Sequence, residues 1–547
     1  MFRAPSVPRG RAPGRAAVAA AVALAAPLAL VAALGPSASA EGQAEGQANG
    51  QAEAGLYTDP FSTTFAAAAN LTGQARDDAQ RLGAVPTSTW LTSGSPAEVS
   101  AQAADVVSRA NAEGDVATLV AYNVPFRDCA QYSAGGATSQ AEYRAWIDGV
   151  ADGVGDGEAV VVVEPDGLGV IPWYTTLEGT QEWCKPAEAD AATAAAERFE
   201  MINYAVDTLG GLPGTKVYLD VGHNGWLNVG DATDRLIKAG VADADGFALN
   251  TSNYQYTANL TAYGRWVSSC IAYVTEVAPG DFGSCGNQYW NGGPANDWTG
   301  VAMSPYAEWS SGNPDPALDT AGVDSRYEQQ LGDVEPSTHY VLDTSRNGRG
   351  PWEAPAGKYS DAETWCNPPG RGLGDLPTHE TGEELVDAHL WIKVPGESDG
   401  KCYRGTGGPL DPERGTEDPA AGRWFTEQAR ELIELAAEPL PTPECAVDYR
   451  VTGRTATGFT GKLRLSVTGD ETVSGWRLRF DLPAGTTVGR GTGAHFDQDG
   501  TIVTATHLRH NARLVPGGDP VPVSFKARGA AFEPGYVTLN GKPCLVS

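Results

Sequence analysis

Carboxylic acids follow five short apolar runs of the chain. They are Asp128, Asp166, Asp220, Asp343 and Glu397. A single acid after a strand is often the N-cap of the next helix, because its side chain accepts hydrogen bonds from free backbone N–H groups. Several acids gathered in one place are more typical of glycoside hydrolysis, in which one carboxylic acid protonates the leaving oxygen and another supports the attacking water.

Histidines and cysteines show no spacing typical of a metal site. None of the seven histidines belongs to a motif such as H-E-x-x-H, and the eight cysteines include no C-x-x-C pair. We therefore expect neither a catalytic metal nor a cofactor.

The apolar runs are short and rich in β-branched residues, and helical stretches separate them. They are Leu119–Tyr122, Ala159–Val163, Lys216–Leu219, Gly246–Leu249, Tyr340–Leu342 and Leu390–Val394. Buried parallel strands that alternate with helices predict an α/β barrel or a doubly wound sheet. The barrel is favoured, because Gly135-Gly136 opens no G-x-G-x-x-G turn of the kind that a dinucleotide-binding sheet carries. In a barrel the carboxyl ends of the strands form one rim, where the acids would meet.

Composition changes sharply at a Pro-rich connector, residues 438–444. Beyond it, in residues 445–547, apolar and polar side chains alternate between Gly-rich turns, as in residues 521–525. This period of two predicts a small β-sandwich. Cys445 and Cys544 bracket the sandwich and would join its first and last strands.

The N-terminal 40 residues have the pattern of a secretory signal peptide. Four arginines precede an Ala-rich apolar run, and Ala38-Ser39-Ala40 is an A-x-A cleavage site. The alternative is an uncleaved membrane anchor, but Pro27 interrupts the run and a low-complexity leader, residues 41–55, follows it. We expect a secreted, extracellular protein without membrane association after cleavage. An even number of cysteines then predicts four disulfides.

The formal charge limits the classes of partner. The chain has 38 Lys and Arg against 68 Asp and Glu, a net charge of −30. Nucleic-acid binding needs a basic face, so this class is excluded. A neutral polysaccharide needs no charged complement, and we expect a monomer that acts on one.

Seven blocks that run in order through residues 56–437 resemble glycoside hydrolase family 6. They are residues 120–136, 161–166 (VVVEPD), 217–226, 248–254, 341–350, 365–367 and 390–400. This family contains endoglucanases and cellobiohydrolases that cleave β-1,4-glucan with inversion on a distorted TIM-like (β/α) barrel. Residues 445–547 resemble a family 2 carbohydrate-binding module. The resemblance implies a secreted cellulase with a catalytic barrel over residues 56–437, a linker and a binding-module-like sandwich.

The resemblance also implies roles for the residues of the rim. Asp166 would be the general acid, and Asp128 would raise its pKa and relay a proton from water. Asp343 corresponds to the proposed catalytic base and Asp220 to a supporting carboxylate. Tyr122 would crowd the sugar at the cleavage point into a distorted ring.

Further residues would contact the glucan or support the carboxylates. The implied sugar contacts are Trp90, Trp226, Trp365, His223, Asn250, Lys393 and Glu397, and the implied supports of the carboxylates are Arg127 and Arg346. Trp146 and Trp391 are better explained as core residues.

Two disulfides, Cys129–Cys184 and Cys366–Cys402, match loop disulfides of the family. Cys270 and Cys285 lie in the segment between Asn250 and Asp343, where we expect a third pair. This segment is enlarged, and we expect it to fold over the cleft.

Two departures from the exo-acting members favour endo action. Glu397 and Cys402 are only five residues apart, which leaves no room for the second loop that roofs an exo cleft. The stretch Trp226–Val229 also lacks the further tryptophan that exo members have a few residues after the one that matches Trp226. The enlarged segment 255–335 argues for the exo alternative. A non-enzymatic alternative is an inactive wall-associated glucan-binding protein, although the acids that such a protein would lose are present.

The sandwich departs from its family at the cellulose-binding face. Thr455, Thr492 and His510 stand where three exposed tryptophans are usual, and Trp476 matches the buried core tryptophan. Without aromatic faces for stacking, we predict weak binding to crystalline cellulose or a purely structural role.

Overall fold

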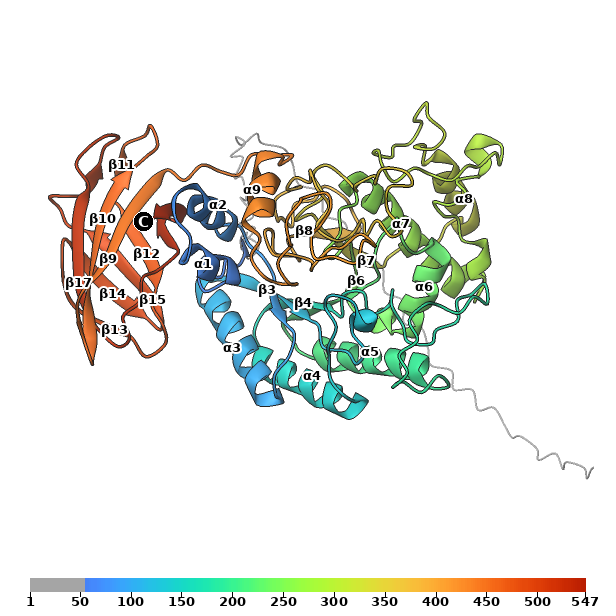
Figure 1. The fold of residues 1–547 in the computed structure, drawn as a ribbon, viewed down its shortest axis with the longest axis horizontal. Helices are drawn as coiled ribbons and strands as arrows, with labels where there is room; N and C mark the ends of the chain where they lie inside the picture. The colour runs from blue at the N-terminus through green and yellow to red at the C-terminus, as the bar shows by residue number, and fades with distance from the viewer. Residues whose placement is uncertain (1–54) are drawn as a thin grey trace, which may run out of the picture. The chain divides into compact units, whose positions relative to one another are not determined.

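The computed structural model describes residues 55–547 (Figure 1). The predicted signal peptide, residues 1–40, and nearly all of the predicted leader, residues 41–55, lie outside the described residues. In the described part of the chain, no helix combines the length and the apolarity needed to cross a bilayer.

A parallel sheet of eight strands forms the framework of the larger domain. Its order is β1-β3-β4-β5-β6-β7-β8, and β2 also pairs with β3. The strands are β1 (Gly55–Leu56), β2 (Thr89–Leu91), β3 (Asp115–Ala121), β4 (Ala159–Val163), β5 (Thr215–Asp220), β6 (Gly246–Leu249), β7 (His339–Asp343) and β8 (Val386–Leu390). The predicted α/β barrel class is confirmed.

The barrel is distorted where its two edges meet. The backbone N–H of Ser88, just before β2, donates to the carbonyl of Trp391, just after β8, at 3.0 Å. The indole Nε1 of Trp90 donates to the carbonyl of Ile392 at 2.8 Å. Single hydrogen bonds therefore replace a strand ladder at this seam.

Helices cover the outer face of the sheet (Figure 1). They are α3 (Pro96–Glu113), α4 (Gln140–Val154), α5 (Ala194–Gly210), α6 (Val229–Lys238), α7 (Thr257–Ala272) and α8 (Ala321–Leu331). The other helices are α1 (Thr63–Ala68), α2 (Gly73–Gly83) and α9 (Thr426–Glu434), and α2 and α9 pack in a separate apolar cluster with Trp391. A capping box of Ser95 and Glu98 starts α3, with Pro96 in its first turn, so three local signals agree on that boundary.

Strand β4 shows why a continuous apolar run was a reliable signal. All five of its residues are buried. Val160 and Val162 pack inside the barrel with Tyr122 and Tyr218, whereas Val161 packs outward against the helices. Both faces are dry, as expected for a parallel strand between two apolar layers.

The predicted strand at Leu390–Val394 is wrong in its position. The strand β8 ends at Leu390, and the residues after it are buried but leave the sheet. In β8 the apolar side chains alternate with Asp387 and His389, which are half-buried. Asp387 accepts hydrogen bonds from Tyr218 and His339 at 2.6 and 2.7 Å. These polar pairs hid the strand from a search for continuous apolar runs.

The C-terminal domain is a β-sandwich, as predicted. Its main strand order is β13-β17-β10-β9-β19-β18-β12-β15-β14. The strands are β9 (Cys445–Thr455), β10 (Gly458–Val467), β11 (Val473–Ser474), β12 (Arg477–Asp481), β13 (Thr487–Thr492), β14 (Ala494–Asp499), β15 (Ile502–His507), β16 (Arg513–Leu514), β17 (Val521–Arg528), β18 (Val537–Leu539) and β19 (Lys542–Val546). It has its own core around Trp476, and the Cys445–Cys544 disulfide joins β9 to β19.

Between β6 and β7 the chain makes a long excursion that includes α7 and α8. The stretch from 278 to 320 has little regular structure and is held by buried asparagines. Asn259 donates to the carbonyl of Ala307 at 3.0 Å, and Asn291 donates to the carbonyls of Pro316 and Asp319 at 2.8 and 2.9 Å. The Cys270–Cys285 disulfide fixes the start of this stretch to α7.

Candidate active site

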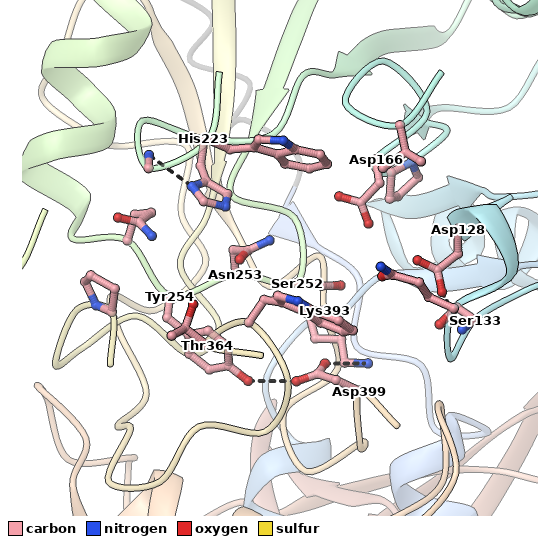
Figure 2. A pocket seen from close by; sticks show the side chains of 18 of the residues that line it. Asp128, Ser133, Asp166, His223, Ser252, Asn253, Tyr254, Thr364, Lys393 and Asp399 are labelled. Atoms are coloured by element: carbon pink, nitrogen blue, oxygen red, sulfur yellow. Dashed lines mark hydrogen bonds and ion pairs between the residues drawn. The ribbon is translucent and has the colours of Figure 1, made fainter. Parts of the chain in front are cut away.

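A cleft of about 430 Å³ lies at the carboxyl ends of the strands (Figure 2). Asp128 follows β3 and Asp166 follows β4, and both line the cleft. A third carboxylate, Asp399, follows β8 and lines it as well. Figure 2 shows these three side chains around the same opening.

Asp128 and Asp166 lie in turns with strained backbone conformations. Asp128, Glu164 and Asp166 have φ angles of 58°, 51° and 61°, in the left-handed region that residues with a Cβ rarely adopt. Each such conformation costs about 1–3 kcal/mol and persists only where the surroundings enforce it. Glu164 helps to hold these turns, because its buried carboxylate accepts hydrogen bonds from the N–H groups of Asn123 and Val124 at 3.0 Å.

Burial is the main cause of the high pKa of Asp166. The pKa lies well above its ordinary value, and the negative charges of Asp220, Asp128 and Asp399 raise it further. Burial raises the pKa of Asp220 too, but its Oδ1 accepts the N–H groups of Asp166 and Gly222 at 2.8 and 3.2 Å. Because these donors favour the charged form of Asp220, the proton of the pair resides on Asp166.

The pKa of Asp128 is also raised, but less than that of Asp166. Burial raises its pKa to about 6, against the opposing effects of the Ser133 N–H group and the Arg127 charge. The Ser133 N–H donates to Asp128 Oδ2 at 2.6 Å. Asp128 is thus an acid able to exchange protons near neutral pH.

Asp399 is held in the opposite charge state. Burial by itself would raise its pKa, but Arg346 and Lys393 outweigh burial, and the pKa lies below its ordinary value. Arg346 Nη1 lies 2.9 Å from Asp399 Oδ2, and Lys393 Nζ lies 3.5 Å from Oδ1. The hydroxyl of Tyr254 donates to Oδ2 at 2.9 Å. This carboxylate is therefore ionised inside the cleft.

The sequence did not single out Asp399. Glu397 is the first acid after the strand and was predicted instead, although Asp399 is only two residues further along the same turn. Glu397 is absent from the cleft lining and accepts a hydrogen bond from Thr63 at 2.5 Å. The sequence held part of the signal, because Lys393 shortly precedes Asp399 and a nearby positive charge keeps a buried carboxylate ionised. Arg346, the other basic partner, lies on the loop after β7 and could not be paired with Asp399 from the sequence.

Asp343 is buried behind the cleft wall. Its oxygens accept the N–H groups of Ser252 and Lys393 at 2.9 Å and of Ser345 at 3.0 Å. Asn250, also predicted at the site, donates its Nδ2 to the Asp343 carbonyl at 2.7 Å. Neither residue is among those that line the cleft. Both join the loops that follow β6, β7 and β8.

The three predicted tryptophans, Trp90, Trp226 and Trp365, line the cleft. Tyr122 lies beside them, with its ring edge-on to Trp90 at 5.4 Å and under the Arg127 guanidinium at 4.4 Å. Sequence reasoning missed four further aromatic side chains that line the cleft. They are Trp183, Tyr254, Tyr306 and Trp352. They lie on loops, where periodicity carries no information on direction.

Two other predicted residues take roles fixed by hydrogen bonds. Arg127 donates to the carbonyls of Ser133 and Thr92 at 2.9 Å, so it fixes the backbone around Asp128. His223 lines the cleft and accepts the N–H of Gly225 at 3.1 Å. Burial lowers the pKa of His223 to about 4, which leaves the ring neutral.

The four disulfides pair the cysteines that were expected to pair. Two of them, Cys129–Cys184 and Cys366–Cys402, join loops around the cleft. Cys402 also lies near Asp411 and Asp418, but its sulfur is in the disulfide and Asp411 is paired with Arg404 at 2.7 Å. These groups therefore offer no set of free metal ligands.

Comparison with known proteins gives two matches that follow one another along the chain. Residues 51–436 match the family model of glycosyl hydrolases family 6, and residues 445–544 match that of a cellulose binding domain. Endoglucanase A of Thermobispora bispora is 29% identical over 492 residues, which cover 84% of this chain and 85% of the relative. Endoglucanase A of Cellulomonas fimi is 31% identical over 384 residues, which cover 70% of this chain and 62% of the relative.

Relatives that are named cellobiohydrolases also match. A probable 1,4-β-D-glucan cellobiohydrolase C of Aspergillus terreus is 30% identical over 413 residues, which cover 70% of this chain and 74% of the relative. Among solved structures, the endoglucanase Cel6 of Mycobacterium tuberculosis is 31% identical. That match covers 70% of this chain and 97% of the other, with a TM-score of 0.48.

Proposed function

The chain belongs to family 6 of the glycosyl hydrolases, and we propose that it is a secreted cellulase that cleaves internal β-1,4 bonds with inversion. One observation carries the proposal. Two carboxyl groups of opposite charge state, protonated Asp166 and ionised Asp399, line one cleft. Inverting hydrolysis needs such a pair, since one group gives a proton while the other takes one from water.

Asp166 supplies the proton. Its raised pKa keeps the carboxyl neutral near pH 7, so it donates to the glycosidic oxygen as the bond breaks. Asp128 then returns a proton to it from solvent, because its pKa of about 6 lies near the working range. The charge of Asp220 keeps Asp166 protonated, and its hydrogen bond to the Asp166 N–H fixes the turn.

We assign the base to Asp399 rather than to Asp343. Asp399 lines the cleft and is ionised, whereas both oxygens of Asp343 accept backbone N–H groups behind the wall. A carboxylate that accepts a proton from water must reach that water. Asp343 instead holds the turn that carries Lys393, and Lys393 and Arg346 hold Asp399.

The aromatic side chains of the cleft suit a neutral glucan. Trp90, Trp226 and Trp365 offer apolar faces to pyranose rings, and Tyr122 crowds the ring at the cleavage point. His223, neutral at pH 7, and Lys393 contribute polar contacts to the hydroxyl groups.

Endo action is favoured by the short turn between Glu397 and Cys402, which forms no roof. Relatives named endoglucanase support it. The exo-acting alternative rests on Pro305 and Tyr306, which bring the excursion before β7 to the cleft, and on relatives named cellobiohydrolase. Secretion is supported by the signal-peptide pattern of residues 1–40 and by the four disulfides.

The sandwich is proposed to bind crystalline cellulose weakly. Within residues 445–547, all of which the structure describes, no Phe, Tyr or Trp side chain is exposed, and Trp476 is buried. Thr492 and His510 line a groove with charged side chains such as Arg450 and Lys462. This surface lacks the flat apolar faces that stack on a cellulose surface.

Replacing Asp128 with Asn is expected to shift the alkaline limb of the pH profile of kcat/KM to lower pH by about one unit. The physical reason is that the negative charge of Asp128 raises the pKa of Asp166, whose protonated form is active. Removing that charge lowers this pKa, so the acid is lost at a lower pH. Asp128→Glu keeps the charge and should keep the limb in place. An unchanged limb in Asp128→Asn would contradict the coupling.

Asp399→Ala is expected to lose about 10²–10⁴-fold in kcat and to regain activity when sodium azide is added. A small anion replaces an activated water at a site that has lost its base. Asp343→Ala is the matched comparison and should lower the melting temperature without rescue by azide, because three backbone donors lose their acceptor. Rescue of Asp343→Ala alone would return the base to that residue.

On carboxymethylcellulose the enzyme is expected to lower viscosity quickly while releasing few reducing ends. Random internal cuts shorten a polymer far faster than cuts at its ends. Asp166→Ala should reduce both signals by about 10²–10⁴-fold. Slow loss of viscosity with many reducing ends would establish the exo alternative, and a wild type without activity would refute the enzyme.

The isolated fragment 445–547 is expected to stay mostly in solution when mixed with microcrystalline cellulose. The variant Thr455→Trp/Thr492→Trp/His510→Trp adds three stacking faces at exposed positions and should move to the pellet. The measurement is the fraction bound after centrifugation. Strong binding of the unaltered fragment to the cellulose pellet would contradict the prediction.

A further inference from the structure

Aromatic side chains are exposed on the excursion before β7, outside the residues that line the cleft. Tyr289, Trp290 and Trp298 are 51%, 41% and 49% exposed. We call these three residues the aromatic platform. Exposed aromatic groups of this size are uncommon on a soluble protein unless they contact a partner.

The platform is rigid. The rings of Trp290 and Trp298 stack with centroids 6.4 Å apart and planes 23° apart. Trp290 also lies close against the backbone of two glycines. A Cβ at Gly292 would come within 2.4 Å of Trp290 Cη2, and one at Gly300 within 2.7 Å of Trp290 Nε1. Only glycine permits this approach, so the ring is fixed before any ligand arrives.

Backbone strain presents the second tryptophan. Asp297 and Trp298 have φ angles of 52° and 59°, two consecutive left-handed residues with a Cβ. For a bulky residue this conformation is rare and usually marks a functional site. The guanidinium of Arg326 lies 5.9 Å from the centroids of both rings and holds the pair from α8.

The platform is continuous with the cleft. The hydroxyl of Tyr289 donates to the carbonyl of Trp226 at 3.0 Å. The neighbouring Gln288 donates to the carbonyls of Asn224 and Leu227 at 2.9 and 2.8 Å, so it fixes the platform to the loop that carries Trp226. At its other side the same segment reaches Tyr306, which lines the cleft.

We propose that the aromatic platform is an additional glucan subsite outside the cleft, which binds the chain where it extends beyond Trp226. The inference rests on the proposed function and adds a residue set to it. The occupant is a neutral β-glucan, because the exposed groups are flat apolar rings.

The test compares polymer with short substrate in the full-length enzyme. Trp290→Ala and Trp298→Ala are expected to raise KM for hydroxyethylcellulose by three- to tenfold and to leave kcat/KM for cellotetraose unchanged. Trp298→Tyr keeps an aromatic face and should retain most of the wild-type KM. Leu410→Ala, which removes a half-exposed apolar side chain outside the cleft lining, is the matched control and should match the wild type.

Three outcomes would overturn the proposal. They are identical KM values in all variants, equal losses on both substrates, and a change of oligomeric state in sedimentation velocity, which would make the platform a contact between copies of the chain. Melting temperatures identify a variant that fails to fold. If Trp290→Ala fails to fold, the comparison of KM between Trp298→Tyr and Trp298→Ala tests the proposal by itself. An inactive wild type would refute the proposed function but not the platform. In that case, electrophoresis in a gel that contains hydroxyethylcellulose tests binding alone. Retardation of the wild type but not of Trp298→Ala would support the platform.

Discussion

The arrangement of the cleft depends on the buried ion pair between Arg346 and Asp399. Arg346 is fully buried, and its Nη1 lies 2.9 Å from Asp399. Taking both charges out of water is costly, and the pair compensates only because further donors, Tyr254 and the Asn367 N–H, complete the carboxylate. One acid is thereby kept ionised in the same cleft in which Asp166 is kept neutral. Acid–base chemistry by two carboxylic acids needs this difference in environment.

The other rim acids serve the same end as positioning groups. Glu164, Asp220 and Asp343 each accept backbone N–H groups from the turn after a neighbouring strand. A buried carboxylate that bridges two turns fixes their relative position and is stabilised by their donors in return. The left-handed φ angles of Asp128 and Asp166 persist because these bridges hold the turns. Strain at Asp128 and Asp166, the acids to which we assign proton transfer, is thus balanced by hydrogen bonds of acids to which we assign a positioning role.

The sequence predicted those features that a local pattern determines. Strand β4 was placed correctly because both of its faces are apolar, and the sandwich was recognised from its period of two. Strand β8 was misplaced because two of its five residues, Asp387 and His389, are polar. The acids after the strands were found, but which of them faces the cleft depends on the turn conformation and on partners from other loops. For this reason Asp343 was given the role that we now propose for Asp399, and the direction of Trp183 and Trp352 was unreadable.

The two domains differ in how far their aromatic side chains are exposed. In the sandwich, every Phe, Tyr and Trp ring is at least partly buried, and its groove at Thr492 and His510 carries charged groups. In the larger domain, Trp290 and Trp298 are about half exposed although each could have been buried as Trp266 and Trp309 are. Exposed tryptophan lowers solubility and is retained where it contributes binding energy. If the proposed function is correct, the catalytic domain itself makes the contacts that hold a glucan chain beyond the cleavage point. This arrangement suits an enzyme that acts on soluble chains more than on crystalline surfaces.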